Sequence, residues 1–225
     1  MPTKENILLK LYELITSSKQ DMLDNIAADR TNYVTVVLED INKEHNASAV
    51  LRTCDCFGVQ TMHVIEKNQE FMIHRDIAMG ARKWVDVTSY SETETPNLDC
   101  INGLKQKGYK IVATTPHTET TIDQLSIDQP IALVFGTERD GISDEIIQHA
   151  DELIRIPMYG FTESFNISVS AAILLSTLRN KLESSELDWK LSKDEQTELK
   201  TKWCTKIIRN GEKVEQEIRK RIKKE

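Results

Sequence analysis

The stretch YVTVVLEDINKEHNASAVLRTCDCFGVQTMHVIE (33–66) decides the fold class. Residues 33–39 form a β-rich apolar run that predicts a buried strand. After a polar turn, residues 47–58 place apolar side chains at helical spacing and end on Gly58, which suits a helix C-terminus. Residues 61–66 predict the next strand. Because strand, helix and strand follow one another, the stretch predicts parallel strands joined by a crossover helix.

The same alternation continues along the chain on both sides of this unit. Further strands are predicted at 84–90, 109–115, 131–136 and 152–157. Further helices are predicted at 95–108, 143–150 and 168–183, with Thr95 and Ser143 as N-caps. Residues 4–28 predict one or two opening helices, 67–82 an irregular segment, and 193–224 one or two exposed helices with a possible break at Gly211. The fold class is therefore α/β, with a mainly parallel sheet, helices on both faces, and ligands expected at the carboxyl ends of the strands.

Composition limits the class of protein. The 225 residues are 39% hydrophobic and 29% charged, enough for one α/β domain with an appendage. No stretch approaches the roughly 18 apolar residues of a membrane-spanning helix, and the N-terminus does not resemble a signal peptide. The cysteines lack the spacing of a zinc site or a disulfide framework, so we expect no metal and a cytoplasmic protein with reduced thiols. These cysteines are Cys54, Cys56, Cys100 and Cys204.

Charge is distributed unevenly, although the net charge is −7. Residues 179–225 hold 14 Lys and Arg against 10 Asp and Glu, a balance of +4, which leaves −11 for residues 1–178. An acidic body with a basic arm is typical of proteins that contact phosphates, although a solvated helix face explains the arm equally well.

Three segments carry candidate chemistry: NKEHNASAVLRTCDCFGV (42–59), LVFGTERDGIS (133–143) and IRIPMYGFTESFNISVSAAILL (154–175). Each also has a purely structural explanation. Arg52 is typical of a surface ion pair, Gly136 and Gly141 of a tight turn with positive φ, and Asn166 and Ser168 of helix N-caps. Glycine motifs for phosphate loops and dinucleotide folds are missing from the sequence.

Taken together, the segments resemble the three motifs of the SpoU (TrmH) family of RNA ribose methyltransferases, a branch of the knotted SPOUT superfamily. The most specific pieces are H-N-x-S-A-x-x-R-T-x-D-x-x-G-V (45–59), G-x-E-x-x-G-I (136–142) and I-P-M-x-G-x-x-x-S-x-N-x-S-V (156–169). The resemblance covers residues 33–180. The helical ends are similar to the branch that methylates the D-loop guanosine of tRNA at position 18.

The resemblance implies a fold, a reaction and partners. The fold is a SPOUT catalytic domain at 31–183 with a C-terminal trefoil knot, flanked by an N-terminal helical segment at 1–30 and a basic helical extension at 184–225. The reaction transfers a methyl group from S-adenosylmethionine to a ribose 2'-hydroxyl without a metal. The partners are tRNA and a second copy of the chain in a homodimer, and no membrane. A ribosomal-RNA methyltransferase of the same family and an inactive RNA-binding module remain alternatives.

The resemblance also implies site residues. Arg52 would activate the 2'-hydroxyl, either as a general base or by orienting it and stabilising developing charge. The other catalytic positions are Asn46, Glu138, Ser164 and Asn166. The donor-binding positions are Thr114, Gly136, Ile156, Met158 and Phe165, where the family commonly has leucine instead of Phe165. The candidate RNA-binding positions are Lys43, His45, Arg75, Arg82, Lys83, Arg219, Lys220 and Arg221. Trp189 and Trp203 are expected either to stack on RNA bases or, more typically, to pack the tail onto its own domain.

Overall fold

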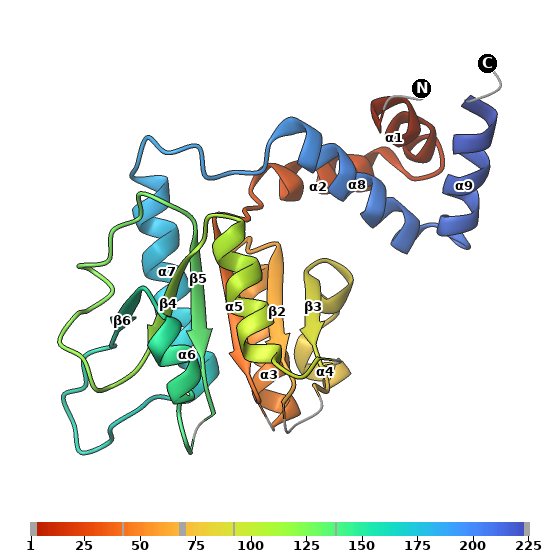
Figure 1. Cartoon of the computed structure of the whole chain (residues 1–225). Helices are drawn as coiled ribbons and strands as arrows, with labels where there is room; N and C mark the ends of the chain where they lie inside the picture. The colour runs from red at the N-terminus through yellow and green to blue at the C-terminus, as the bar shows by residue number, and fades with distance from the viewer. Residues whose placement is uncertain (1–3, 42, 68–70, 92, 138, 223–225) are drawn as a thin grey trace. The chain divides into compact units, whose positions relative to one another are not determined.

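A computed structural model describes residues 4–41, 43–67, 71–91, 93–137 and 139–222 (Figure 1). The chain divides into two compact units. One unit is continuous and spans Asn32–Trp189. The other is helical and combines Met1–Thr31 with Lys190–Glu225.

The continuous unit contains a sheet of six strands in the order β3-β2-β1-β5-β4-β6. All five neighbouring pairs are parallel, in agreement with the predicted sheet. Every residue of the central strands β1 and β5 is buried, as expected for strands covered on both faces. The strands are β1 (Val34–Glu39), β2 (Thr61–Ile65), β3 (Asp86–Tyr90), β4 (Lys110–Thr114), β5 (Ile131–Phe135) and β6 (Glu152–Ile154).

Two hydrophobic cores lie on opposite faces of this sheet. Successive side chains of a strand point to opposite faces, so Val36 and Leu38 join one core while Val37 joins the other. Helices α3 (Glu44–Cys56) and α7 (Ile167–Glu183) pack together in the first core. Helices α5 (Pro96–Gln106) and α6 (Asp144–His149) pack together in the second. Figure 1 shows the two pairs on opposite sides of the strands.

Most of the predicted elements are confirmed, and two details differ. The segment predicted as irregular contains the short helix α4 (Arg75–Ala78) and the 3₁₀ turn η1 (Ala81–Lys83), both too short to show a helical period. Ser143 caps α6 by accepting a hydrogen bond from the backbone N–H of Ile146, as predicted. Thr95 occupies the N-cap position of α5, but its side chain makes no capping hydrogen bond.

The helical unit brings the two ends of the chain together. Helix α8 (Lys193–Ile207) packs against α1 (Lys4–Tyr12) and α2 (Ser17–Ala28), and α9 (Gly211–Ile222) packs against α8 and α1. Gly211 lies at the start of α9, where the sequence predicted a break. The core of the helical unit includes Ile7, Leu11, Leu23 and Trp203, which are nearly or fully buried. The sequence predicted these ends as segments 1–30 and 184–225, and the structure packs their helices into one unit.

Both tail tryptophans serve packing. Trp203 is 1% exposed, with the Arg30 guanidinium 5.4 Å from its ring centre. Trp189 is 7% exposed and joins the core of the continuous unit, with the Arg179 guanidinium 4.4 Å from its ring. Buried rings cannot stack on RNA bases in this conformation, so that prediction is wrong. The alternative prediction, that both rings pack inside the protein, is confirmed.

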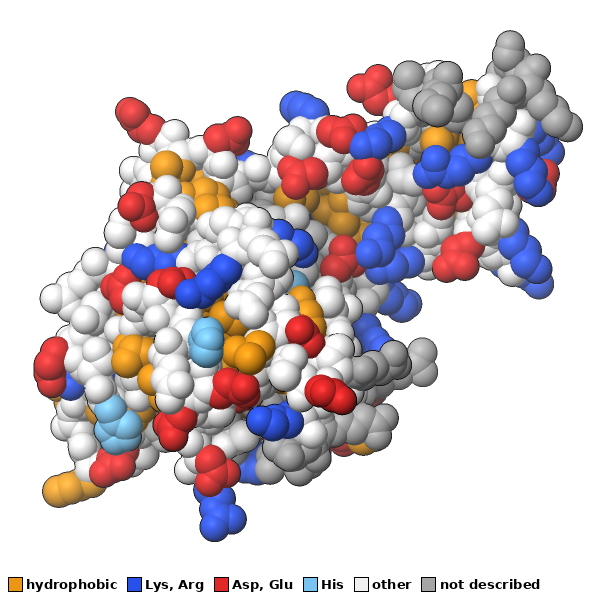
Figure 2. All heavy atoms as spheres, viewed as in Figure 1, with side chains coloured by type: hydrophobic (Ala, Val, Ile, Leu, Met, Phe, Trp, Pro, Cys, Tyr) orange, Lys and Arg blue, Asp and Glu red, His pale blue; other side chains and the backbone are white. Residues whose placement is uncertain are grey.

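The described part of the chain contains no helix that combines the length and the apolar character needed to cross a bilayer. In the space-filling view, Lys and Arg side chains are spread over the visible face of the helical unit among acidic ones (Figure 2).

Candidate active site

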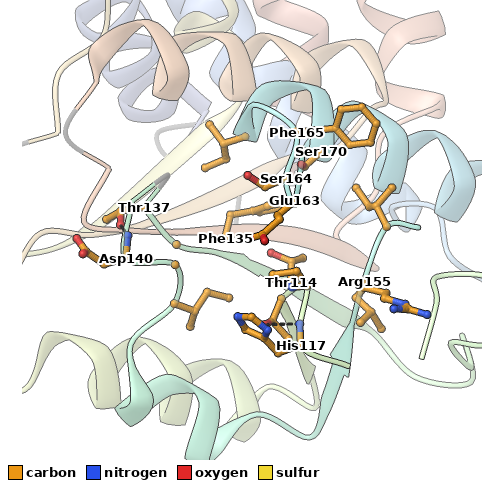
Figure 3. A pocket seen from close by; sticks show the side chains of 18 of the residues that line it. Thr114, His117, Phe135, Thr137, Asp140, Arg155, Glu163, Ser164, Phe165 and Ser170 are labelled. Carbon is orange, nitrogen blue, oxygen red and sulfur yellow. Dashed lines mark hydrogen bonds between the residues drawn. The ribbon is translucent and has the colours of Figure 1, made fainter. Parts of the chain in front are cut away.

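A pocket of about 470 Å³ lies at the carboxyl ends of β4, β5 and β6. Its lining comes from four segments that are distant in sequence, within 114–117, 135–147, 154–158 and 163–174. Figure 3 shows Ser164 and Ser170 on one side of the pocket and Thr114 and His117 on the other. The position agrees with the general rule for ligand sites in parallel sheets.

All five residues predicted to bind the methyl donor line this one pocket. Thr114 ends β4, Gly136 follows β5, and Ile156 and Met158 follow β6. Phe165 lies just before α7 and is 43% exposed, so its ring stands at the pocket edge. Ser164, predicted as a catalytic residue, lines the same space.

The glycines of the second motif shape the turn that closes the pocket. A Cβ atom on Gly136 would lie 2.0 Å from the backbone oxygen of Gly141, so no other residue fits without displacing backbone. The backbone groups of Thr137 and Gly141 exchange two hydrogen bonds of 2.9 and 3.1 Å, which hold this approach. Gly141 has φ +71°, confirming the predicted turn, whereas Gly136 is required for space rather than for a positive φ.

The pocket combines an apolar interior with a polar rim. Phe135, Ile142, Ile154, Ile167 and Leu174 provide apolar walls suited to a flat aromatic ring. Polar and charged side chains also line the pocket and could orient a ligand that has both an apolar and a charged end. They are His117, Arg139, Asp140, Arg155, Glu163 and Ser170.

Arg155 is a lining residue that the sequence reasoning missed. Its Nη2 forms an ion pair with Glu119 Oε2 at 2.6 Å, which ties the strand end to the loop between β4 and β5. Its Nε is buried and has no hydrogen-bond partner among the described residues. The signal that could have identified His117 and Arg155 is their position just after the carboxyl ends of strands β4 and β6.

Asn46 and Asn166 join the first and third motifs. Asn166 Nδ2 donates a hydrogen bond of 3.0 Å to Oδ1 of Asn46, which is buried at the start of α3. Asn166 Oδ1 accepts from the backbone N–H and the hydroxyl of Ser168, so it also caps α7. The capping explanation of Asn166 is confirmed, and the same side chain connects α7 to α3.

Arg52 does not line the pocket. It is exposed on α3, and within the described residues it forms no hydrogen bond or ion pair. Its expected neighbour Glu138 lies outside the described residues. The structure therefore gathers the predicted donor-binding positions and Ser164 around one pocket, and it places Arg52 on a solvent-accessible surface.

Glu39 is a buried residue behind the pocket that the sequence reasoning also missed. It ends β1, and its carboxylate accepts hydrogen bonds from Ser143 N–H at 2.9 Å and Asn97 Nδ2 at 3.2 Å. Ser143 follows the pocket residue Ile142, so this carboxylate anchors the second-motif loop. Burial raises the pKa of Glu39, and the hydrogen bonds from Ser143 oppose that effect. An acid at the end of an otherwise apolar strand is the signal that could have identified it.

The predicted RNA-binding residues fall on both units. Lys43, His45, Arg82 and Lys83 are exposed on the continuous unit, around α3 and η1. The side chain of Arg75 is not among those that the structure describes. The α9 residues Arg219, Lys220 and Arg221 are exposed on the helical unit. Arg219 and Lys220 form intrahelical ion pairs with Glu215 and Glu217.

Known proteins resemble this chain in sequence and in fold. Residues 33–176 match the model of the SpoU rRNA Methylase family. A tRNA (guanosine(18)-2'-O)-methyltransferase of Borreliella burgdorferi is 36% identical over 91% of this chain and 93% of its own length.

Two solved structures extend the comparison. The A. aeolicus TrmH/SpoU tRNA modifying enzyme superposes with a TM-score of 0.76 at 28% identity, covering 85% of this chain and 98% of that one. An AdoMet-bound rRNA methyltransferase from Sinorhizobium meliloti has the same fold, with a TM-score of 0.60 at 21% identity over 71% and 60% of the two chains. By its motifs, its sheet and its relatives, the chain belongs to the SpoU methylase family.

Proposed function

We propose that the protein transfers a methyl group from S-adenosylmethionine to the ribose 2'-hydroxyl of guanosine 18 in the D-loop of tRNA. The observation that carries this proposal is that all five expected donor-binding residues line the same pocket. The match to the Borreliella enzyme over nearly the whole chain supports the choice of tRNA.

The donor fits both the apolar interior and the polar rim of the pocket. The apolar walls, including Phe135 and Leu174, accept the adenine ring, and the close approach at Gly136 exposes backbone groups to it. The charged rim faces the amino-acid end of the donor. Phe165 flanks the adenine with an aromatic ring, at a position where leucine is common in the family.

The reaction is a direct displacement. The ribose 2'-oxygen forms a bond to the methyl carbon, the carbon–sulfur bond breaks, and S-adenosylhomocysteine leaves as the hydroxyl proton is lost. The sulfonium is already a good leaving group, so alignment of oxygen, methyl and sulfur provides much of the acceleration. Arg52 activates the hydroxyl, as a base or by orienting it. Asn46, Glu138, Ser164 and Asn166 position Arg52 and the RNA.

The active site is completed by a homodimer in which each site borrows from the partner chain. Two observations support this part of the proposal. Arg52 is exposed and lies outside the pocket of its own chain. Apolar side chains close to the site are also exposed, as expected of a surface that another chain covers. They are Tyr159, Phe161, Phe165 and Val169.

The chain is tied into a trefoil knot, in which its C-terminal part passes through the loop between β4 and β5. Contacts between this loop and later elements support the proposal. Thr121 of the loop pairs with Arg155. The Lys181 ammonium on α7 donates to the backbone oxygens of Ile122, Asp123 and Leu125. A loop that encircles the segment leading to α7 would make such contacts.

A labelling experiment tests the function. The protein is incubated with methyl-labelled donor and total RNA from cells that lack the modification, and the RNA is separated by size. The alkali-resistant dinucleotide then identifies the methylated ribose. Label in the tRNA fraction at the D-loop guanosine is the expected result. Label in large RNAs would favour the ribosomal-RNA alternative, and no label would favour an inactive binding module.

A further inference from the structure

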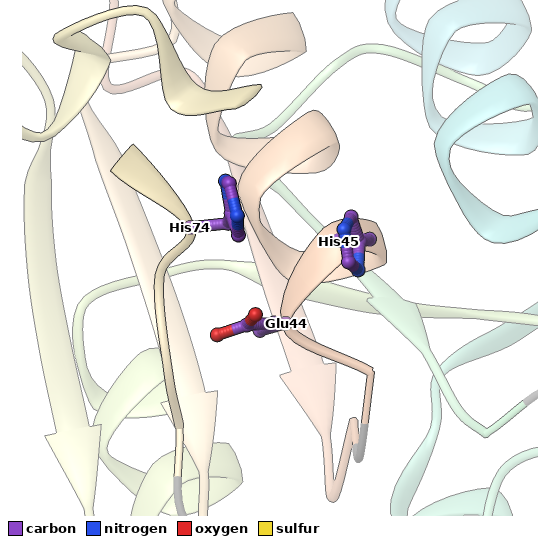
Figure 4. A group of neighbouring side chains, drawn as sticks. All are labelled: Glu44, His45 and His74. Atoms are coloured by element: carbon purple, nitrogen blue, oxygen red, sulfur yellow. The ribbon is translucent and has the colours of Figure 1, made fainter. Parts of the chain in front are cut away.

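Two histidines and one glutamate meet on the surface at the start of α3. Glu44 and His45 begin the helix, and His74 comes from the segment leading into α4 (Figure 4). One nitrogen of each histidine and one carboxylate oxygen of Glu44 lie within 4.8 Å of one another. The two imidazole rings are stacked, with centres 5.1 Å apart and planes 21° apart.

The side-chain polar atoms of this cluster form no hydrogen bond or ion pair with other described residues. Nδ1 of His74 is buried and has no hydrogen-bond partner. No hydrogen bond or ion pair involves the side chain of Glu44 or His45 within the described ranges. A buried, unpaired imidazole nitrogen is costly unless something binds it, and a stacked pair of rings alone does not satisfy it.

The backbone holds the two segments in place before any ligand arrives. The backbone N–H of His74 donates a hydrogen bond of 2.7 Å to the hydroxyl of Ser48. Ser48 is completely buried on α3, so this contact fixes His74 beside the first turns of the helix. Helices α3 and α4 also pack against each other. The cluster is therefore preorganised by contacts that do not involve its own ligand atoms.

We propose that Glu44, His45 and His74 bind a divalent transition-metal ion of the Zn²⁺ type. Two imidazole nitrogens and one carboxylate oxygen form a ligand set that such ions favour over Mg²⁺. Ligand atoms about 2.1 Å from an ion in tetrahedral coordination lie roughly 3.4 Å apart, so the exposed ring of His45 turns inward on binding. Three protein ligands leave a fourth position open to water or to a phosphate oxygen.

The ion takes no part in the methyl transfer itself, and it lies on the side where the acceptor RNA approaches. It links the start of α3, which carries Asn46, to the segment before α4. It also adds positive charge beside the exposed side chain of Lys43. RNA phosphates are attracted to such charge, and one of them can occupy the open position.

Metal titration of the full chain tests the site. Protein stripped with a chelator is titrated with Co²⁺, whose visible absorption reports tetrahedral coordination, and then with Zn²⁺ in competition. The expected result is one equivalent bound, with tetrahedral bands that Zn²⁺ removes and that excess Mg²⁺ leaves unchanged. In His74→Ala and His45→Ala the affinity should fall by more than the roughly 10- to 100-fold that loss of an outer-shell partner costs. Glu44→Gln should weaken binding less.

Matched variants separate this site from other metal-binding groups. His149→Ala removes an exposed histidine from α6, and Cys56→Ser removes the exposed thiol of α3. Both should bind Co²⁺ like the wild type. His74→Asn keeps a polar side chain, and unchanged circular dichroism and donor binding in either His74 variant would show that it is folded. Absence of stoichiometric binding, or equal affinity in folded His74 variants, would overturn the proposal.

Discussion

The donor pocket and the surface at the start of α3 differ in how much of their geometry one chain fixes. The pocket is closed by backbone contacts at Gly136 and Gly141 and anchored from behind by Glu39. Arg52 and His45, in contrast, are exposed. The difference agrees with the proposal that the chain alone prepares the donor site, whereas RNA and a second copy complete the acceptor site.

Gly136→Val should have the largest effect, because it breaks the pocket itself. The added Cβ would meet the Gly141 backbone oxygen at 2.0 Å, which a flexible neighbour cannot relieve. We expect S-adenosylmethionine binding, measured by calorimetry, to fall by at least about 100-fold, on the order of 3 kcal/mol. Gly103→Ala, at a position with nothing within 4 Å, should bind the donor like the wild type. Near-normal affinity in Gly136→Val would remove this turn from the donor site.

Arg52→Ala tests the acceptor side. Loss of the activating guanidinium should reduce single-turnover methyl transfer by roughly 100- to 10,000-fold, the usual range for acid–base or charge-stabilising groups. Donor affinity should stay nearly unchanged, because Arg52 lies outside the pocket. Arg52→Lys keeps the charge but not the planar fork and should recover only part of the rate. Comparable transfer by the alanine variant would exclude Arg52 from its assigned role.

Mixed dimers sharpen the same comparison. When Arg52→Ala chains are co-expressed with Gly136→Val chains, a site that borrows Arg52 from the partner should regain part of the lost activity. Only in a mixed dimer does the intact pocket of the Arg52→Ala chain meet the intact Arg52 guanidinium of the Gly136→Val chain. A mixture no more active than its separate components would show that both groups act within one chain.

Glu39→Gln should have a moderate effect on donor binding and a pH-dependent effect on stability. Weaker anchoring of Ser143 should raise the KM for the donor by roughly tenfold with kcat little changed, about the value of one charge-assisted hydrogen bond. Burial raises the pKa of Glu39 above its usual 4.5, so folding costs more once this group ionises.

The stabilising contribution of Glu39 is therefore present at low pH and is lost as the pH rises through its raised pKa. Urea unfolding at several pH values should show the stability of the glutamine variant improving relative to the wild type over that rise. A constant difference in the free energy of unfolding across this range would contradict the assignment.

Substitution of Arg219, Lys220 and Arg221 by alanine should have the smallest effect. These residues are exposed on α9, and two of them already pair with acids on the same helix. We expect weaker tRNA binding and a salt dependence flattened by roughly 1 to 3 units of slope. Donor binding serves as the control and should not change. An unchanged slope would remove α9 from the RNA contact.

Much of the fold could be predicted from local patterns. The buried strand 33–39 and the helix 168–183 have clear apolar periods, and the structure contains both as β1 and α7. The pairing of the terminal helices α1 and α8 could not be predicted, because packing between distant segments leaves no local period. Helix α4 was missed because a helix of a single turn is too short to show a helical period of apolar residues.

The proposed donor site was more predictable than the surface around it. Its glycines and apolar residues lie in motifs, so the resemblance located them, and all five line one pocket. Glu39 and Arg155 act through contacts with residues far away in sequence, and no motif marks them. The grouping of Glu44 and His45 with His74 depends on how the segment before α4 packs on α3, which spacing alone cannot reveal.

One measurement tests the central claim most directly. Two unmodified tRNAs are prepared that are identical except that one has 2'-deoxyguanosine at position 18, and each is incubated with the protein and methyl-labelled S-adenosylmethionine. We predict one methyl group per molecule in the ribose-containing tRNA and none in the deoxy-substituted one. Equal labelling of both tRNAs, or of neither, would contradict transfer to this 2'-hydroxyl.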